Sequence, residues 1–534
     1  MAPSSAPMRP RSGVALRVGM RVLAAAIAFG AARLLAACSL GNVSQEDCAD
    51  DAECVSAFGL GSACEGGYCA AAPVCTTNVD CRDALGAATV CAAKKCTRAS
   101  LDERCKISEP ETLLATLQAG ESVGDTLLMG AVLLDDGGNQ SARIAAIRLA
   151  VREMNKAGGV LGRPFGLVVC HNQGSEADAT IAADLVVHLG DEIGAPVVVG
   201  PASTNDAIAA VNAVLASPAP IAIISPSATG GQLTLQSDRF RPDDPVGMFW
   251  RTAPSDELQA KVLAKAIDAA LGAEEEIVLS VLYQDDAYGQ GLEAKLRSAL
   301  EEVPGDFVLR SEKFALTDLE ASVGEAIARA KDEQPAAVIV LAGNADRALA
   351  VVRAASDRAE LRTLPFFFSD GAKDKSVLLQ SGDDGVDAIL AGATGTSPAN
   401  PVEGSFFDAL ESDFGVEASQ FGFVAHAYDA AYIAALGLAH AARDGGHLDG
   451  LQVAIGLSHL SAGSKVALGP SDFSGGVTTL LTADGTVNVT GQSGPLDFDA
   501  ATGDAPGPIE IWRVAAGGEA FERVGDPETP SGDD

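Results

Sequence analysis

Residues 195–204 read APVVVGPAST and residues 221–229 read IAIISPSAT, and these two stretches indicate the architecture of the chain. Each begins with a run of small and β-branched apolar residues, which is typical of a strand buried on both faces. Each run ends in a loop rich in Pro, Ser and Ala, and a helical pattern follows it. Strand, polar loop and helix in this order predict an α/β protein built on parallel strands.

The two loops also predict a binding site. Their hydroxyl groups lie between the end of a strand and the start of a helix, where free backbone N–H groups and the helix dipole favour an anion. In open α/β sheets, ligands bind at this edge. The alternative is that these Ser and Thr side chains only cap the helices, which is a common role for them. A single loop would favour capping, whereas two such loops in successive units favour a ligand.

The alternation of strands and helices continues outward from these loops. It runs from about residue 126 to 224 and again from about 258 to 368, so we expect two similar Rossmann-like lobes, each a parallel sheet flanked by helices. A chain of 534 residues is also too long for one core. The predicted boundaries are 125–248 plus 395–470 for the first lobe, 249–394 plus 471–515 for the second, 106–124 for a linker or short helix, and 516–534 for an acidic, disordered tail.

Composition excludes several classes of function. The formal net charge is −35 and no basic cluster occurs outside the N-terminus, so nucleic acid is not an expected partner. No GxSxG, HExxH or P-loop motif is present, and the six histidines are scattered. We therefore predict neither an enzyme nor a metal site nor a bound cofactor.

The N-terminus predicts export. Arginines precede a short apolar run at 22–29, which is too short to span a membrane, and the run leads to Leu35-Ala36-Ala37-Cys38. Small residues before Cys38 resemble the lipobox of bacterial lipoproteins, which implies a signal peptide at 1–37 and lipidation of Cys38. The chain would then be anchored in the cell envelope by lipid alone, at the outer membrane or the periplasmic face. A plain signal peptide with a free Cys38 is the alternative.

The cysteines reveal an internal duplication within residues 38–105. The four cysteines of residues 48–69 recur 27 positions later in residues 75–96. The equivalent positions in the two copies are Cys48 and Cys75, Cys54 and Cys81, Cys64 and Cys91, and Cys69 and Cys96. Export favours disulfides, and four cysteines allow three pairings, among which the sequence does not choose. A zinc site would need CxxC pairs and neighbouring histidines, which are missing. Cys105 and Cys170 either pair with each other or remain free thiols.

Seven motifs follow one another in the large domain. They are MNKAGGVLGRP at 154–164, GPAST at 200–204, SPSAT at 225–229, FWRT at 249–252, DAYGQG at 286–291, AYDA at 427–430 and GPLDFD at 494–499. In this order they resemble the branched-chain amino-acid-binding (Leu/Ile/Val-binding) family of ABC-transporter substrate-binding proteins, which are type I periplasmic binding proteins. The resemblance covers about residues 126–515. It implies two lobes joined by three crossovers, with a ligand held in the cleft between them.

The resemblance also implies which residues contact the ligand. They are Ser203, Thr204, Ser227, Ala228, Thr229, Tyr288, Asn344, Asp370 and Phe423. The loop residues would hold a carboxylate, Tyr288 would pack over the ligand, and Asp370 would receive an α-ammonium group. Local sequence alone favours a turn or cap role for Asp370 before Gly371. The acidic pair Asp135 and Asp136 departs from the pattern of relatives and leaves the identity of the ligand open.

Together these features predict a lipid-anchored extracytoplasmic substrate-binding protein. It would capture a small polar solute, an amino acid or a related carboxylate, by closure of its lobes and would deliver it to an ABC permease. The alternative is a surface sensor or adhesion lipoprotein of the same fold that signals or binds a protein. The cysteine-rich duplication and Ser39, which follows the lipobox as in outer-membrane sorting, favour this alternative.

Overall fold

The computed structural model describes residues 48–70, 72–272, 276–401, 404–443, 448–482 and 484–529. Contacts divide the chain into two units, residues 1–72 and residues 73–534. The predicted signal peptide and Cys38 lie outside the described residues. Within those residues, the structure contains no helix with the length and apolar character needed to cross a bilayer.

Both cysteine-rich repeats have the same disulfide pairing. The first repeat consists of α2 (Asp51–Phe58) and the short strands β1 (Cys64–Glu65) and β2 (Tyr68–Cys69), and the second of α3 (Asn78–Leu85), β3 (Thr89–Ala92) and β4 (Lys95–Arg98). The bridges are Cys48–Cys64 and Cys54–Cys69 in the first repeat and Cys75–Cys91 and Cys81–Cys96 in the second. In each repeat the first cysteine therefore pairs with the third and the second with the fourth.

The second repeat packs against the first lobe of the large domain. Asn78 Nδ2 donates to Asp191 Oδ2 at 2.7 Å, and the Arg82 guanidinium also contacts Asp191. The positions 27 residues earlier, in the first repeat, hold Asp51 and Val55 instead. The two repeats share their disulfides, but only the second has the side chains that make this contact.

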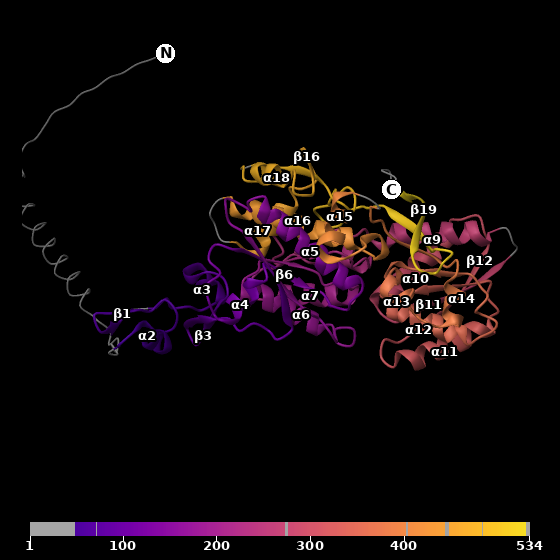
Figure 1. Cartoon of the computed structure of the whole chain (residues 1–534), viewed down its shortest axis with the longest axis horizontal. Coiled ribbons are helices and arrows are strands. Elements are labelled where there is room, and N and C mark those ends of the chain that lie inside the picture. Colours follow the sequence, from indigo (N-terminus) through magenta and orange to yellow (C-terminus); the bar gives the residue numbers. More distant parts are fainter. Residues whose placement is uncertain are drawn as a thin grey trace, which may run out of the picture. The chain divides into compact units, whose positions relative to one another are not determined.

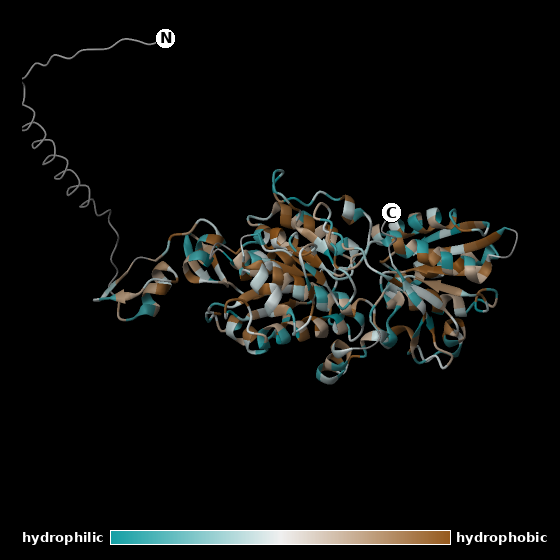
Figure 2. Ribbon diagram, turned by 90° about the horizontal axis from the view of Figure 1, so that it is seen from above, coloured by the Kyte–Doolittle hydropathy of each residue, from teal (hydrophilic) through white to brown (hydrophobic). Residues whose placement is uncertain are grey.

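The first large sheet has six strands in the order β10-β9-β8-β6-β7-β5. Its parallel strands are β6 (Leu127–Val132), β7 (Phe165–Cys170), β8 (Val197–Val199), β9 (Ala222–Ser225) and β10 (Phe249–Arg251). These strands are buried and largely hydrophobic (Figure 2). Helices α5 (Asn139–Lys156) and α16 (Val424–Ala442) pack together on one side of the sheet, and α6 (Thr180–Val187) and α7 (Thr204–Ala216) on the other (Figure 1).

Residues 106–124, for which the sequence predicts a linker or a short helix, contain a short helix and are packed against the first lobe. Strand β5 (Cys105–Glu109) pairs antiparallel with β7, and helix α4 (Thr112–Gln118) follows it. Leu113 and Leu117 are buried in the core of the first lobe, which explains why the segment is ordered against the sheet. The disulfide Cys105–Cys170, one of the two alternatives from the sequence, joins the paired strands.

The second large sheet has seven strands in the order β12-β11-β13-β14-β15-β18-β19. Its parallel strands are β11 (Ile277–Gln284), β12 (Phe307–Phe314), β13 (Ala337–Leu341), β14 (Phe366–Phe368) and β15 (Thr394–Pro398). Helices α9 (Asp256–Leu271) and α10 (Ala287–Leu300) contribute to one core, and α11 (Leu319–Asp332) and α12 (Ala345–Ser356) to another. Along β13, Val338 lies in one core and Ile339 in the other, so both faces are covered and the strand is apolar throughout.

The C-terminal segment is not wholly the disordered tail predicted for residues 516–534. Strand β19 (Phe521–Glu528) pairs antiparallel with β18 (Ile509–Val514) at the edge of the second sheet. Phe521 packs edge-on against Trp512 with 4.9 Å between ring centroids, and Arg523 pairs with the buried Glu510 at 2.6 Å. These contacts order a segment whose acidic, turn-rich composition predicts disorder.

The chain crosses between the two sheets three times, after β10, after β15 and before β18, which confirms the predicted two-lobe fold.

Two predicted lobe boundaries are wrong. Strand β10 belongs to the first sheet, and helix α18 (Phe473–Leu480) and strand β17 (Val487–Thr490), placed by the sequence in the second lobe, pack in the first core. The ring of Phe473 packs edge-on against that of Phe165 in β7, with 6.1 Å between the ring centroids. The irregular sequence pattern after residue 470 does not indicate this contact.

Candidate functional site

A cleft of about 680 Å³ lies between the two lobes. Its lining comes from loops at the carboxyl ends of parallel strands in both sheets, which is where α/β sheets bind ligands. Seven of the nine predicted contact residues line it, namely Ser203, Thr204, Ser227, Tyr288, Asn344, Asp370 and Phe423. The topology therefore brings together side chains that are up to 220 positions apart in the sequence.

Ala228 and Thr229 are not among the lining residues, contrary to the prediction. Both are buried, and Ala228 packs in the core of the first lobe. The Ala228 N–H donates to Ser225 Oγ at 3.0 Å, and the Ala228 carbonyl accepts from Arg251 Nη1 at 3.1 Å. The Thr229 carbonyl accepts from the N–H of Asp256 at 3.0 Å. Ser227 is therefore the residue of this predicted group that faces the cleft.

The residues that carry the hydroxyl groups of the two loops line the cleft, and these hydroxyl groups are also hydrogen-bonded to the protein. Ser203 Oγ accepts from the N–H of Asp206 at 3.1 Å and caps α7, so the capping alternative holds for this residue. Thr204 Oγ1 accepts from the N–H of Gly230 at 3.1 Å and thereby links the two loops. Ser227 Oγ donates to the Ala202 carbonyl at 3.0 Å, a second link between them. The loops form one preorganised surface.

Arg143 is a cleft residue that the sequence analysis missed. It lies on α5, is 6% exposed and donates from Nη1 to Ser227 Oγ at 3.0 Å. Its Nε donates to the Gly422 carbonyl at 3.1 Å, and its guanidinium lies 4.9 Å from the centre of the Phe423 ring. Burial lowers the pKa of Arg143 to about 10, so it remains charged at neutral pH. The sequence does contain a signal for this residue, because a charged side chain stands at a position of the apolar face of α5, one helical turn before Ile147.

The second lobe presents Asp370 to the cleft. Asp370 Oδ1 accepts hydrogen bonds from the hydroxyl of Tyr288 and, at 3.0 Å, from Gln259 Nε2. Burial raises the pKa of Asp370 and of Tyr288. The short helix at Asp370–Ala372 receives no cap hydrogen bond from a side chain, so the local prediction of a capping role does not apply. Asp370 is a buried acceptor held in place by two donors.

A second buried carboxyl group, Asp256, lies beside Asp370. It is the first residue of α9 and is 1% exposed. Burial, reinforced by the charge of Asp370, raises the pKa of Asp256 to about 7. Between about pH 4 and 7 the native protein therefore holds a proton that the unfolded chain has released, and this residue makes stability fall as the pH rises through that window.

We expect Asp256→Asn to raise the free energy of unfolding at pH 8 by about 2–4 kcal/mol, because it removes a carboxylate that burial disfavours. Near pH 4 the native carboxyl group is already neutral, so the substitution should change stability little. Chemical denaturation of both proteins at the two pH values measures the difference, in which the titration of all other groups cancels. An equal change at both pH values would contradict the assignment.

The two lobes also touch across the cleft. Asn344 caps α12 and donates from Nδ2 to Glu176 Oε1 at 3.0 Å, while Arg347 Nη2 lies 3.2 Å from Glu176 Oε2. Elsewhere along the cleft, the N–H of Asn139 donates to Asp374 Oδ2 at 2.7 Å. The predicted residue Asn344 is thus a contact between lobes as well as a lining residue.

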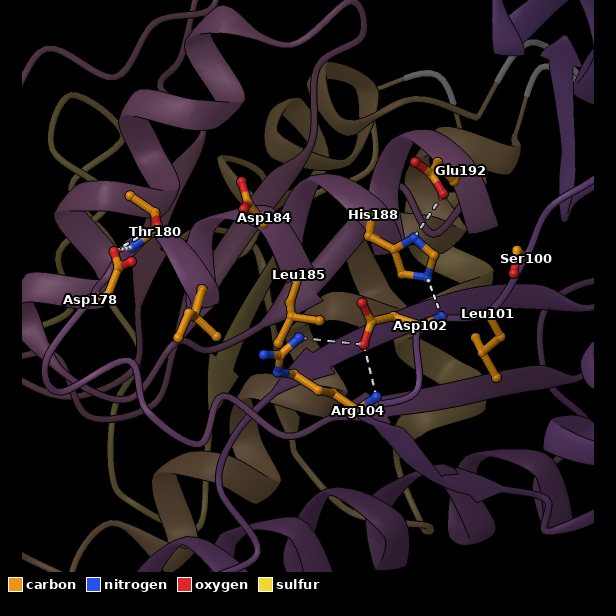
Figure 3. A pocket seen from close by; sticks show the side chains of 11 residues that line it. Ser100, Leu101, Asp102, Arg104, Asp178, Thr180, Asp184, Leu185, His188 and Glu192 are labelled. Atoms are coloured by element: carbon orange, nitrogen blue, oxygen red, sulfur yellow. Dashed lines mark hydrogen bonds and ion pairs between the residues drawn. The ribbon is translucent and has the colours of Figure 1, made fainter.

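A further hollow of about 570 Å³ lies on the first lobe, next to the segment that follows the second repeat (Figure 3). His188 lies in it, with Nδ1 2.9 Å from Glu192 and Nε2 accepting from the N–H of Asp102 at 3.1 Å. Both ring nitrogens are therefore occupied by the protein. This histidine joins residues 100–104 to the helical segment His188–Ile193 and has a structural role.

Comparison with known proteins places this geometry among binding proteins. A family model described as periplasmic binding protein matches residues 131–519. A leucine-binding protein from Thermotoga maritima has 17% identity, covers 75% of this chain and 98% of its own, and gives a TM-score of 0.57. A branched-chain amino acid transporter substrate-binding protein from Streptococcus pneumoniae, in complex with isoleucine, has 22% identity, 75% and 99% coverage, and a TM-score of 0.54.

A third solved structure broadens the range of ligands in similar folds. A solute-binding protein of an ABC transporter from R. palustris, in complex with benzoate, has 16% identity, covers 76% of this chain and 97% of its own, and gives a TM-score of 0.53. A comparison with curated proteins found no match. At these identities the solved structures establish the fold.

Proposed function

The chain belongs to the periplasmic binding protein family, and on this basis we propose that it is an extracytoplasmic substrate-binding protein for an amino acid or a related small carboxylate. It would serve an ABC-type importer and be held in the envelope by a lipid on Cys38. The ligand would be bound in the cleft between the lobes. Like its family, it acts by binding rather than by catalysis.

The observation that carries this proposal is the placement of opposite charges on the two lobes. Arg143 of the first lobe and Asp370 of the second both line the cleft, and both are buried. A zwitterion would place its carboxylate near Arg143 and Ser227, where charge-assisted hydrogen bonds are available. Its ammonium group would face Asp370. The solved relatives with bound isoleucine and benzoate support a ligand that carries a carboxylate.

Lobe closure follows from this arrangement. A ligand that contacts both lobes binds the closed state better than the open one and shifts the population toward closure. The contacts of Glu176 with Asn344 and Arg347 would then form as the lobes meet. The closed form is the state that a permease would distinguish from the empty protein.

A thermal-shift panel tests the proposal. We expect one or more of the twenty common amino acids, or a small carboxylate such as benzoate, to raise the melting temperature of the full chain. A ligand present at about 1,000 times its Kd adds about 4 kcal/mol to the stability of the native state. A complete panel without a shift would rule out this ligand class.

The sensor or adhesion alternative retains one supporting observation, the duplicated disulfide unit whose first copy forms part of a separate unit. An importer component requires a permease, so solute uptake by cells should fall when the gene is deleted. Normal uptake in the deletion strain, together with a ligand-dependent protein partner, would favour the alternative.

A further inference from the structure

One backbone segment of the second lobe lies between the two charged groups of the cleft. Asp370 begins a short helix that ends at Ala372, and Lys373 follows it. The carbonyl of Lys373 accepts from the N–H of Gly422 at 3.0 Å, and the Gly422 carbonyl accepts from Arg143 Nε at 3.1 Å. Asp370 and Arg143 come from different lobes, so Lys373 and Gly422 form a backbone link between the two proposed anchors of the ligand.

Gly422 fits closely against this segment. A side-chain carbon added at Gly422 would lie 3.6 Å from the carbonyl oxygen of Asp370 and 3.8 Å from that of Lys373. The N–H of Gly422 also donates to Asn139 Oδ1 at 2.8 Å, and the N–H of Asn139 donates to Asp374 Oδ2 at 2.7 Å. Because the contact is tight, a shift of the segment that carries Asp370 changes its spacing from the first lobe.

The side chain of Lys373 anchors the segment in the second lobe. Lys373 is 4% exposed, and its Nζ pairs with Oε1 of Glu510 on β18, which is 1% exposed. Ser397 Oγ donates to the same oxygen at 3.2 Å, and Arg523 pairs with Glu510 Oε2 at 2.6 Å. An amine buried this deeply needs an anion beside it. Glu510 therefore fixes where Lys373, and the backbone that carries it, can lie.

Lys373 does not reach the ligand site with its own charge. The described residues that line the cleft include its neighbours Asp370 and Asp374 but not Lys373 itself. Its side chain lines a separate cavity of about 140 Å³, together with Glu510 and Arg523. Any effect of Lys373 on binding must therefore act through the position of Asp370.

Resting on the proposed function, we propose that Lys373 is a positioning residue, which sets the separation between the carboxylate site at Arg143 and the ammonium site at Asp370. An α-amino acid carries its amine on the carbon next to its carboxylate, so its two charges have a short, fixed separation. The pair of Lys373 with Glu510 would hold Asp370 at the matching distance before the ligand arrives, and such preorganisation raises affinity. Lys373 would thereby select α-amino acids over carboxylates that lack the amine.

Two probes separate this role from general damage to the fold. The first is whichever of the twenty common amino acids binds the full chain most tightly. The second is its desamino acid, which keeps the carboxylate and the side chain but has no amine to place at Asp370. We expect Lys373→Met to weaken binding of the amino acid about tenfold, as for one impaired hydrogen bond to a charged group, and to change binding of the desamino acid less than about twofold. Isothermal titration measures the first Kd, and displacement titration measures the second.

The choice of variants limits other effects. Lys373→Met removes a buried charge but leaves Glu510 paired with Arg523. Lys373→Arg keeps the pair with Glu510, and the adjoining cavity offers room for the larger group, so affinity for the amino acid should stay within about threefold of the unaltered chain. Lys331→Met, in the last turn of α11 and paired with Glu360 at 3.6 Å, is the matched control and should change neither probe.

The outcomes distinguish this inference from the proposed function. Equal weakening of both probes by Lys373→Met, no weakening of the amino acid, or a Lys373→Arg protein that binds no better than Lys373→Met overturns the positioning role and leaves the proposed function intact. If Lys373→Met does not fold, Lys373→Gln, which keeps a donor for Glu510 without the charge, is judged by the same probes. Absence of binding by every amino acid to the unaltered chain overturns the proposed function and this inference with it.

Discussion

Asp370→Ala is expected to abolish the thermal stabilisation that the ligand produces. Asp370 is the buried acceptor that the second lobe offers to an ammonium group, and Tyr288 and Gln259 hold it in place. Loss of one partner of a buried, charge-assisted contact costs about 2–5 kcal/mol of binding energy, or a factor of about 30 to several thousand in Kd. Thermal-shift and titration experiments with the ligand found in the panel measure the loss.

Two further variants separate charge from packing at this position. Asp370→Asn keeps the size of the side chain and removes its charge, so it should lose nearly as much affinity as Asp370→Ala. Tyr288→Phe removes one donor to Asp370 Oδ1 and keeps the ring, so we expect a smaller loss, of about tenfold. Unchanged affinity in a folded Asp370→Asn protein would show that this carboxylate does not receive the ligand.

Arg251→Met is expected to lower the free energy of unfolding by about 3–5 kcal/mol. Arg251 is fully buried, and its Nε pairs with Asp504 Oδ1 at 2.6 Å. Its Nη1 donates to the carbonyls of Ala228 and Gly230, both at 3.1 Å, and Nη2 donates to Thr234 Oγ1 at 2.6 Å. Substitution would leave buried acceptors without donors and would release the loop that presents Ser227.

The appropriate control is Arg353→Met, because Arg353 is exposed on α12. A change of less than about 0.5 kcal/mol is expected there. Denaturant titrations followed by circular dichroism report both values. A loss below about 1 kcal/mol for Arg251→Met would contradict this expectation and would mean that water entering the site replaces the hydrogen bonds of this side chain.

The sequence predicted the parallel strands well, because these strands are buried on both faces and are apolar in nearly every position. Val197–Val199 and Ala337–Leu341 are examples. It did not predict the parallel strands β10 and β15, of which β15 has the largely polar sequence TGTSP. It also failed for β5 and β19, which are edge strands with alternating or charged residues. Such strands are ordered by partners far along the chain, as the contact between Trp512 and Phe521 and the bridge between Cys105 and Cys170 show.

Local pattern also located the two hydroxyl-bearing loops of the candidate site, since loops at the ends of parallel strands meet at one edge of a sheet. It placed Ser203, Thr204 and Ser227 on the cleft, but it did not identify Arg143. The helical spacing of α5 assigns that position to the buried face, and the partners of the charged side chain, Ser227 and the Gly422 carbonyl, come from segments 84 and 279 residues away.

The amino-acid sequence was thus sufficient to predict two parallel-sheet lobes, a duplicated cysteine-rich unit and the hydroxyl-bearing loops, because each of these features depends on residue spacing within a short segment. The pairing of the cysteines and the lobe to which residues 471–505 belong depended on the folded chain. Those features arise from contacts between distant segments, such as Glu176 and Asn344, 168 positions apart, whose proximity no local periodicity encodes.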